Sequence, residues 1–277
     1  MSEPRVRRTP RRIAVVPAYN EAPTVESVLS VLAPLVDELV VVDDGSTDDT
    51  RAIIQRWMPT VGNVHLLWHD ENQGMSEAYT LALGDLRRRL RAGELDSDDL
   101  VFTVDADGQH DLGVLDELTR ITIDEGLDAM LARRDLSDYP PYKVAGNWVM
   151  STWASLWAGQ RLFDVESGYR IVRLGALAHA LDYYQGYKYS ETVELAVVLC
   201  RLGYRVRNDH LVPVPVFRSN TRMVDAVIDL AVMPRAAARV WLRSSRRPSP
   251  ASVAPVAGAV TAVGIGAWLL RRRQHGK

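Results

Sequence analysis

The stretch LVFTVDAD, residues 100–107, decides how the rest of the chain is interpreted, because an apolar run ends there in two carboxylates. An apolar run of this length is typical of a buried strand. Similar runs lie at 13–16, 39–42 and 64–68, and segments with helical spacing separate them, at 25–32, about 47–57 and about 75–90. This alternation predicts an α/β fold with a mostly parallel sheet and helices on both faces.

Acidic and polar residues follow three of the four predicted strands. Asn20 and Glu21 come after the first, Asp43 and Asp44 after the second, and the Asp105-Ala106-Asp107 triplet after the fourth. The carboxyl ends of parallel strands meet at one edge of a sheet, and ligands of such sheets bind there. We therefore expect these loops to converge on one crevice.

The two carboxylates of the triplet are candidate metal ligands. Two carboxylates one residue apart can share a hard divalent cation such as Mg²⁺ or Mn²⁺, which prefers oxygen ligands and would neutralise a leaving diphosphate. Gln109 could add a neutral oxygen, whereas His110 fits a turn or surface position better. Aspartate is also common in turns and caps, so it is the wholly apolar strand before Asp105 that favours a metal site. For Asp43 and Asp44, a nucleotide contact and an ordinary turn remain equal alternatives.

Four ordered motifs resemble those of glycosyltransferase family 2: VPAYNE at 16–21, VDDGSTD at 42–48, NQG at 72–74 and DADGQH at 105–110. The resemblance covers about residues 12–223 and implies the GT-A fold, an inverting transfer, a nucleotide diphosphate sugar (GDP-mannose or a UDP-hexose) and a divalent metal. Two further motifs, DVESGYR at 164–170 and PVPVFR at 213–218, resemble those of polyprenyl-phosphate sugar transferases such as dolichyl-phosphate mannose synthases. That branch implies a polyprenyl phosphate acceptor.

The resemblance also implies roles for individual residues. The metal ligands would be Asp105, Asp107 and Gln109; the nucleotide sugar would meet Pro17, Tyr19, Glu21, Asp43 or Asp44, and Asp105; catalysis would depend on Asp107, Arg134, Arg218 and Arg222; and the acceptor would meet Lys143, Ser167 and Arg170. The chain departs from the branch in lacking the lysine often found after Gly74 and in carrying Arg222 where many members have lysine. A Gln-x-x-Arg-Trp motif is absent from the sequence, which argues against a processive polymerase.

Two alternatives remain open. The acceptor could be a hydroxyl of a glycan or small metabolite, for which Glu166 is the best-placed base. A phosphate monoester is already mostly anionic at neutral pH and needs cations more than a base. The chain could instead be a nucleotide-binding module without turnover, although the intact pair Asp105 and Asp107 argues against this.

The composition and the chain ends set further limits. With 277 residues and a formal net charge of -2, nothing in the overall charge favours a nucleic acid partner, and the single cysteine, Cys200, excludes an intramolecular disulfide. No charged residue lies in the 23 positions between Arg247 and Arg271. A span of that length can cross a bilayer, and we expect a C-terminal transmembrane anchor that holds the protein at the cytoplasmic face of the cell membrane. A buried core helix is the alternative.

These features predict the following organisation: a basic tail at 1–11, a GT-A catalytic domain at 12–223, an amphipathic helix and an Arg/Pro/Ser linker at 224–252, a transmembrane helix at 253–270 and a basic tail at 271–277. Small residues within 253–270 suit close helix contact, which makes a homo-oligomer possible.

Overall fold

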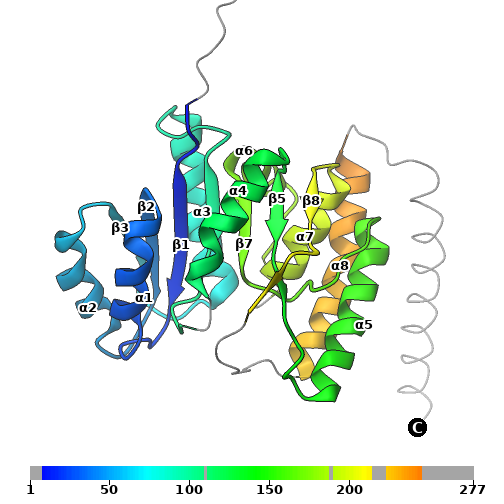
Figure 1. The fold of residues 1–277 in the computed structure, drawn as a ribbon, viewed down its shortest axis with the longest axis horizontal. Helices are drawn as coiled ribbons and strands as arrows, with labels where there is room; N and C mark the ends of the chain where they lie inside the picture. The colour runs from blue at the N-terminus through cyan, green and yellow to red at the C-terminus, as the bar shows by residue number, and fades with distance from the viewer. Residues whose placement is uncertain (1–7, 109–110, 187–189, 214–222, 245–277) are drawn as a thin grey trace, which may run out of the picture.

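The computed structural model describes residues 8–108, 111–186, 190–213 and 223–244, and Figure 1 shows their arrangement. A seven-stranded sheet has the order β3-β2-β1-β4-β7-β5-β8, and β6 pairs with β9 in a separate two-stranded sheet. The strands are β1 Arg12–Ala18, β2 Glu38–Asp44, β3 Val64–His69, β4 Leu100–Thr103, β5 Ala129–Leu131, β6 Arg133–Arg134, β7 Arg170–Arg173, β8 Val206–Arg207 and β9 Leu211–Val212. The helices are α1 Val25–Leu32, α2 Thr50–Trp57, α3 Met75–Arg91, α4 Leu115–Asp124, α5 Pro141–Ala158, α6 Leu174–Ala180, α7 Glu191–Arg201 and α8 Met223–Arg243. Short 3-10 turns cover Ala33–Leu35, Met58–Thr60 and Leu112–Val114.

The first half of the chain forms the parallel part of the sheet. The apolar runs become β1 to β4, which pair in parallel in the order β3-β2-β1-β4. In the register of β1 and β2, Ala18 lies opposite Asp43, and in that of β2 and β3, Asp44 lies opposite His69. The carboxyl ends of these strands therefore share one edge of the sheet, and the loops that follow β1, β2 and β4 begin there.

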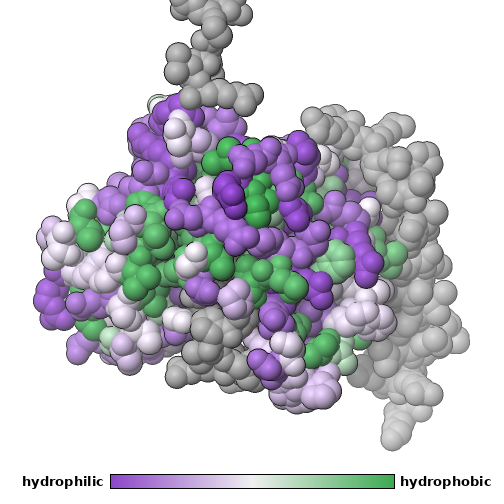
Figure 2. All heavy atoms as spheres, in the orientation of Figure 1, coloured by the Kyte–Doolittle hydropathy of each residue, from purple (hydrophilic) through white to green (hydrophobic). Residues whose placement is uncertain are grey.

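Side chains alternate along the strands and feed two cores, one on each face of the sheet. In β1, Ile13 and Val15 belong to a core with α3, α5, α6, α7 and α8, whereas Ala14 and Val16 belong to a core with α1, α2 and α4. This is the period of two that a strand buried on both faces requires. The predicted α/β fold with helices on both faces of a mostly parallel sheet is confirmed. Figure 2 shows hydrophilic and hydrophobic residues interspersed over the viewed surface.

The second half inserts an antiparallel strand. β7 runs antiparallel between β4 and β5, with Phe102 opposite Ile171. A side-chain hydrogen bond also joins β4 to the segment that precedes β7. The Thr103 hydroxyl donates to the carbonyl of Gly168 at 2.5 Å. The segment 164–169 consequently lies beside the end of β4, where the Asp105-Ala106-Asp107 triplet begins.

The predicted localisation requires a correction. Within the described ranges, no helix combines the length and the apolar character that a bilayer span requires. The expectation of a protein held at the cytoplasmic face of the membrane by a C-terminal anchor is therefore wrong for the chain that the structure describes. The segment 253–270 on which that expectation depended lies outside the described residues.

Candidate active site

The loop after β2 is built around the buried carboxylate of Asp43. This side chain is fully buried and forms a salt bridge with Arg51, and it also accepts a hydrogen bond from the backbone N–H of Ser46 at 3.2 Å. The Arg51 guanidinium in turn donates to the carbonyl of His69 at 2.6 Å, at the end of β3. Asp43 therefore fixes the shape of the loop by joining the ends of β2 and β3.

Asp44 joins the same loop to the NQG motif. Its carboxylate accepts from the backbone N–H groups of Gly74 at 2.8 Å and Gln73 at 3.1 Å, and it lies 2.7 Å from Nδ1 of His69. Gly74 has a φ of 94°, a conformation that favours glycine, and it directly precedes α3. Two backbone N–H groups of the 72–74 motif thus hold the carboxylate of Asp44 in place.

Gly45 lets the two loops approach each other. Its φ is 69°, and a Cβ built on it would lie 2.3 Å from the backbone carbonyl carbon of Glu71. No side chain fits such an approach without backbone movement. In the Asp43-Asp44-Gly45 sequence, hydrogen bonds and a salt bridge thus hold the two carboxylates, and Gly45 packs closely against the backbone of Glu71.

The loop after β1 is hydrogen-bonded to the loop after β2. Asn20, at φ 56°, donates its N–H to the Ser46 hydroxyl at 3.0 Å, and its side-chain oxygen accepts from the N–H of Thr47 at 2.8 Å. The N–H of Glu21 donates to the Thr50 hydroxyl at 2.8 Å. Of the two other predicted residues here, Pro17 is buried within β1, whereas Tyr19 is 44% exposed. Tyr19 is thus free to contact a ligand through its side chain, and Pro17 is not.

Three carboxylates accumulate negative charge where β1 and β4 end. Asp105 and Asp107 are partly exposed. The pKa of Glu21 is raised, first by burial and then by the negative charges of Asp107, Asp105 and Asp48, against the lowering effect of a hydrogen bond from Thr24. These charge interactions indicate that Glu21 lies near the triplet.

The carboxylates of Glu21, Asp105 and Asp107 carry the negative charge and the oxygen atoms that a hard divalent cation prefers. Among the described residues no group of three or more acidic, histidine or cysteine side chains is arranged as a complete metal cage. Two partly exposed carboxylates suit an ion such as Mg²⁺ or Mn²⁺ that keeps positions open for phosphate oxygens and water. Gln109 and His110 lie outside the described residues.

Arg134, in β6, is paired with Asp164, which lies in the segment before β7. Its Nε and Nη2 donate to the two oxygens of that fully buried carboxylate at 2.8 and 2.9 Å, and its backbone N–H donates to Oδ2 at 2.9 Å. Burial lowers the pKa of Arg134, but the hydrogen bonds and charge of Asp164 outweigh it, and the net shift is upward. Arg134 therefore holds β6 to the segment before β7.

Glu166 lies between two cations. Its Oε2 is 3.7 Å from Nη2 of Arg134, and the charge of Lys143, in the first turn of α5, also acts on it. Burial raises the pKa of Glu166, and the two cations only partly oppose this effect. Glu166 and Lys143 thus form a charged group that retains partial exposure.

Ser167 and Arg170, both part of the 164–170 motif, are buried. Arg170 is 4% exposed and donates from Nε to the carbonyl of Ser167 at 3.0 Å. Burial lowers the pKa of Arg170 to about 10. It lines a small enclosed cavity together with Tyr79 and Glu191, and burial raises the pKa of Glu191 to about 8. In this structure Arg170 thus stabilises the backbone of the 164–170 segment. Arg218 and Arg222 lie outside the described residues.

Sequence reasoning missed several residues that shape the site. Arg51, His69 and Asp164 are the partners of predicted residues, and Glu191 and Tyr79 accompany Arg170. Two of them carried a signal: Asp164 begins the 164–170 motif, and Glu191 is an acid at the start of the largely apolar helix α7. No local pattern reveals the pairings themselves.

Comparison with known proteins identifies the class that this fold and these loops define. Residues 13–171 match the model of Glycosyl transferase family 2. The chain belongs to this family, and it is an enzyme of the type that transfers sugars from nucleotide sugars on a GT-A-like fold.

Three particular proteins illustrate the relationship. An uncharacterised protein of Methanocaldococcus jannaschii is 26% identical over 72% of this chain and 86% of its own length. The UDP-N-acetylglucosamine–dolichyl-phosphate N-acetylglucosaminyltransferase of Methanococcus voltae is 25% identical over 68% of this chain and 78% of its own length. Glucosyl-3-phosphoglycerate synthase of Mycobacterium tuberculosis, solved with Mn²⁺, UDP-glucose and phosphoglyceric acid, superposes with a TM-score of 0.56 at 21% identity, over 85% of this chain and 82% of that one. A segment of 46 residues is 56% identical to the same synthase, which is 15% of this chain and 14% of that protein.

Proposed function

We propose that the protein is an inverting, metal-dependent glycosyltransferase that moves a hexose from a nucleotide diphosphate sugar to a polyprenyl phosphate. The observation that carries the donor half of this proposal is the gathering of Glu21, Asp105 and Asp107 beside the anchored Asp43-Asp44 loop. An acidic crevice without cations would repel a diphosphate. It suits one when a divalent ion lies between the carboxylates and the phosphate oxygens.

In this proposal Asp105 and Asp107 hold Mg²⁺ or Mn²⁺, with Gln109 as a further oxygen ligand. When bound, the ion supplies Lewis-acid stabilisation of the leaving diphosphate. The loop that contains Asp43 and Asp44 receives the nucleoside, with the exposed ring of Tyr19 at its rim. The Mn²⁺ and UDP-glucose in the superposed mycobacterial synthase support this assignment.

The acceptor assignment depends on the cations of the second half. A polyprenyl phosphate presents an oxygen that is already mostly ionised at neutral pH. It therefore needs positive charge to position it, and Lys143, whose charge also acts on Glu166, provides such charge. We assign Arg218 and Arg222 to the same task. The dolichyl-phosphate relative from Methanococcus voltae supports this assignment.

A hydroxyl acceptor is the second candidate, and Glu166 is the observation that favours it. Transfer to a hydroxyl with inversion needs a general base near the nucleophile. The pKa of Glu166 is raised by burial, which moves this carboxylate toward the range where a base is effective. The mycobacterial relative named glucosyl-3-phosphoglycerate synthase was solved with phosphoglyceric acid, a small metabolite that is not a lipid phosphate, which supports a metabolite acceptor as the alternative.

One assay distinguishes the candidates. The full-length chain would be incubated with UDP-glucose, UDP-N-acetylglucosamine or GDP-mannose, with Mg²⁺ or Mn²⁺, and with either a short polyprenyl phosphate or the free polyprenol. The proposal expects transfer to the phosphate with inverted anomeric configuration, a strong loss in Arg218→Ala and in Arg222→Ala, and a small effect of Glu166→Gln.

Preference for the free alcohol, with Glu166→Gln as the inactive variant, would replace the phosphate acceptor by a hydroxyl. Donor binding without transfer to any acceptor and without donor hydrolysis would point to a binding module that lacks turnover.

A further inference from the structure

Exposed large hydrophobic side chains are concentrated on two helices. Of the twelve that the described part of the chain exposes, six lie on α5 and α8. They are Tyr142, Val144, Trp148, Val149, Trp241 and Leu242. Trp148 is 67% exposed and Leu242 is 73% exposed. Single exposed apolar residues are normal on a protein surface, whereas a group of them marks a contact surface.

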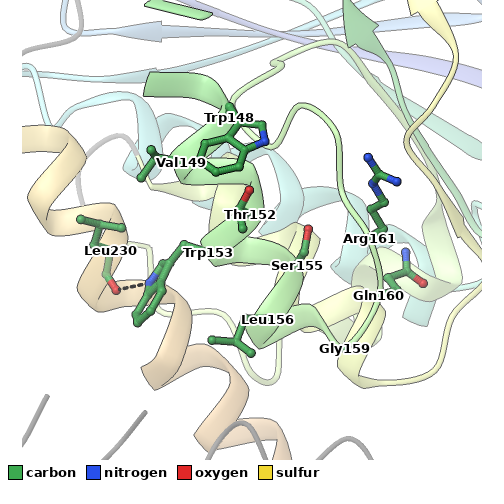
Figure 3. Close-up of a pocket in the computed structure, with 10 residues that line it drawn as sticks. All are labelled: Trp148, Val149, Thr152, Trp153, Ser155, Leu156, Gly159, Gln160, Arg161 and Leu230. Atoms are coloured by element: carbon green, nitrogen blue, oxygen red, sulfur yellow. Dashed lines mark hydrogen bonds between the residues drawn. The ribbon is translucent and has the colours of Figure 1, made fainter. Parts of the chain in front are cut away.

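Part of this surface is hollowed into an apolar groove, which Figure 3 shows. Its walls include Trp148, Val149, Trp153 and Leu156 of α5 and Leu230 of α8. The indole N–H of Trp153 donates to the carbonyl of Leu230 at 3.0 Å and ties the two helices together. The polar requirement of this tryptophan is thus met within the protein, so that the groove offers an occupant chiefly apolar contact.

We propose that this groove is the docking site of the chain's own apolar segment, residues 253–270. The segment has no charged residue and is rich in Val, Ala and Gly, so exposure to water would be unfavourable. As a helix, its 18 residues would be about 27 Å long. This equals the length expected for α5, which also has 18 residues.

The connection is long enough for the segment to return to the groove. Leu230 precedes the end of α8 at Arg243 by 13 residues, which is about 20 Å along a helix. The nine residues 244–252 can span up to about 30 Å when extended. The last turn of α8 exposes Trp241 and Leu242, so that further apolar surface lies where the linker begins.

Photo-crosslinking in the full-length chain tests this docking. The photoreactive residue p-benzoylphenylalanine would replace Trp148, which preserves an aromatic side chain at an exposed position. Trp68, 52% exposed on β3 at the far edge of the sheet, provides the matched control position. The adduct formed at position 148 would be mapped by mass spectrometry of the monomer.

Docking predicts a monomer adduct within 253–270 whose yield is unchanged on dilution, and no such adduct from position 68. Ile265→Asp in the same full-length protein should reduce the yield at position 148. The proposal is overturned if the adduct appears only in crosslinked dimers, since a second copy would then occupy the groove. It is also overturned if no adduct maps to 253–270, or if vesicles of phosphatidylcholine and phosphatidylglycerol abolish it, since a lipid surface would then compete as the true partner of the segment.

Discussion

Two regions of the molecule, the strand ends of the parallel half and the segments around β6 and β7, use charged residues differently. On the side of β1, β2 and β4, Asp105 and Asp107 remain partly exposed, while Asp43 and Asp44 are fixed by groups from β3, α2 and the 72–74 motif. On the side of β6 and β7, Arg134 forms a salt bridge with Asp164, and the side chain of Arg170 is buried. The first side presents charge to a ligand, and the second uses much of its charge to hold its own backbone.

This difference shows what a motif can and cannot indicate. Carboxylates that follow parallel strands reach a common edge because the sheet places them there. Arginines in a segment next to an antiparallel strand have no such constraint, and their partners decide whether they face a ligand or the protein. The predictions below test whether the two sides are as different as the contacts suggest.

The largest effect is expected for Asp107→Asn on the donor side. An amide cannot supply the negative charge that a divalent ion requires, and several kcal/mol of leaving-group stabilisation corresponds to a loss of about a thousandfold or more in transfer rate. Circular dichroism and thermal unfolding should show an intact fold, because Asp107 is partly exposed. Asp124→Asn, at an exposed position at the end of α4, is the control and should retain full activity. Wild-type activity of Asp107→Asn in the presence of a chelator would remove the metal assignment.

The next effect concerns stability on the acceptor side. Arg134→Ala should leave Asp164 buried without its partner and lower the free energy of unfolding by about 3 kcal/mol, measured by denaturant titration. The double variant Arg134→Met with Asp164→Leu should recover much of that loss, since it removes both charges. If Arg134→Ala instead leaves stability unchanged and raises only the KM for the acceptor, then Arg134 faces the ligand and the two regions are alike.

Gly45→Ala tests the packing of the donor loops. The substitution combines a positive φ with a Cβ placed against the backbone of Glu71, and it should cost about 2 kcal/mol or more in stability and raise the KM for the donor. Gly62→Ala is the matched control, because Gly62 also has a positive φ, 76°, but has no atom within 4 Å of the added Cβ. Equal costs for the two substitutions would show that the close approach at Gly45 is unimportant.

The smallest effect is a change in the pH dependence of stability in Glu191→Gln. Because the pKa of Glu191 rises from 4.5 to about 8 on burial, the folded protein keeps this proton over a range in which the unfolded chain has lost it. Its stabilising contribution is therefore complete below pH 4.5 and is lost as the pH rises to about 8. In Glu191→Gln this decline should flatten, because glutamine has no carboxyl proton to lose over this range. Identical pH profiles for variant and wild type would exclude a buried, protonated Glu191.

Much of the first half could be predicted from the sequence, because its strands are continuous apolar runs with a clear period. The predicted runs at 13–16, 39–42 and 64–68 lie within β1, β2 and β3. Local details were harder: Thr24 directly precedes α1, but its hydroxyl donates to the carboxylate of Glu21 and does not accept a hydrogen bond from the helix. Capping depends on side-chain rotamers that the sequence does not specify.

The second half was less predictable because its short strands depend on partners far along the chain. β5 and β7 pair antiparallel, and no periodicity in residues 129–131 reveals this. The burial of Arg170 follows from the same arrangement. The predicted membrane localisation depended on the hydropathy of one segment, and none of the helices in the described ranges has the length and apolar character of a bilayer span.

The central claim is that the acidic edge binds a nucleotide diphosphate sugar through a divalent ion. Isothermal titration calorimetry of the full-length protein with UDP-glucose and GDP-mannose, each with Mn²⁺ and with a chelator, tests it most directly. The account predicts that one donor binds with Mn²⁺, that chelation removes this binding, and that Asp107→Asn does not bind the donor under either condition. Equal donor affinity with and without the metal, or undiminished affinity in Asp107→Asn, would contradict it.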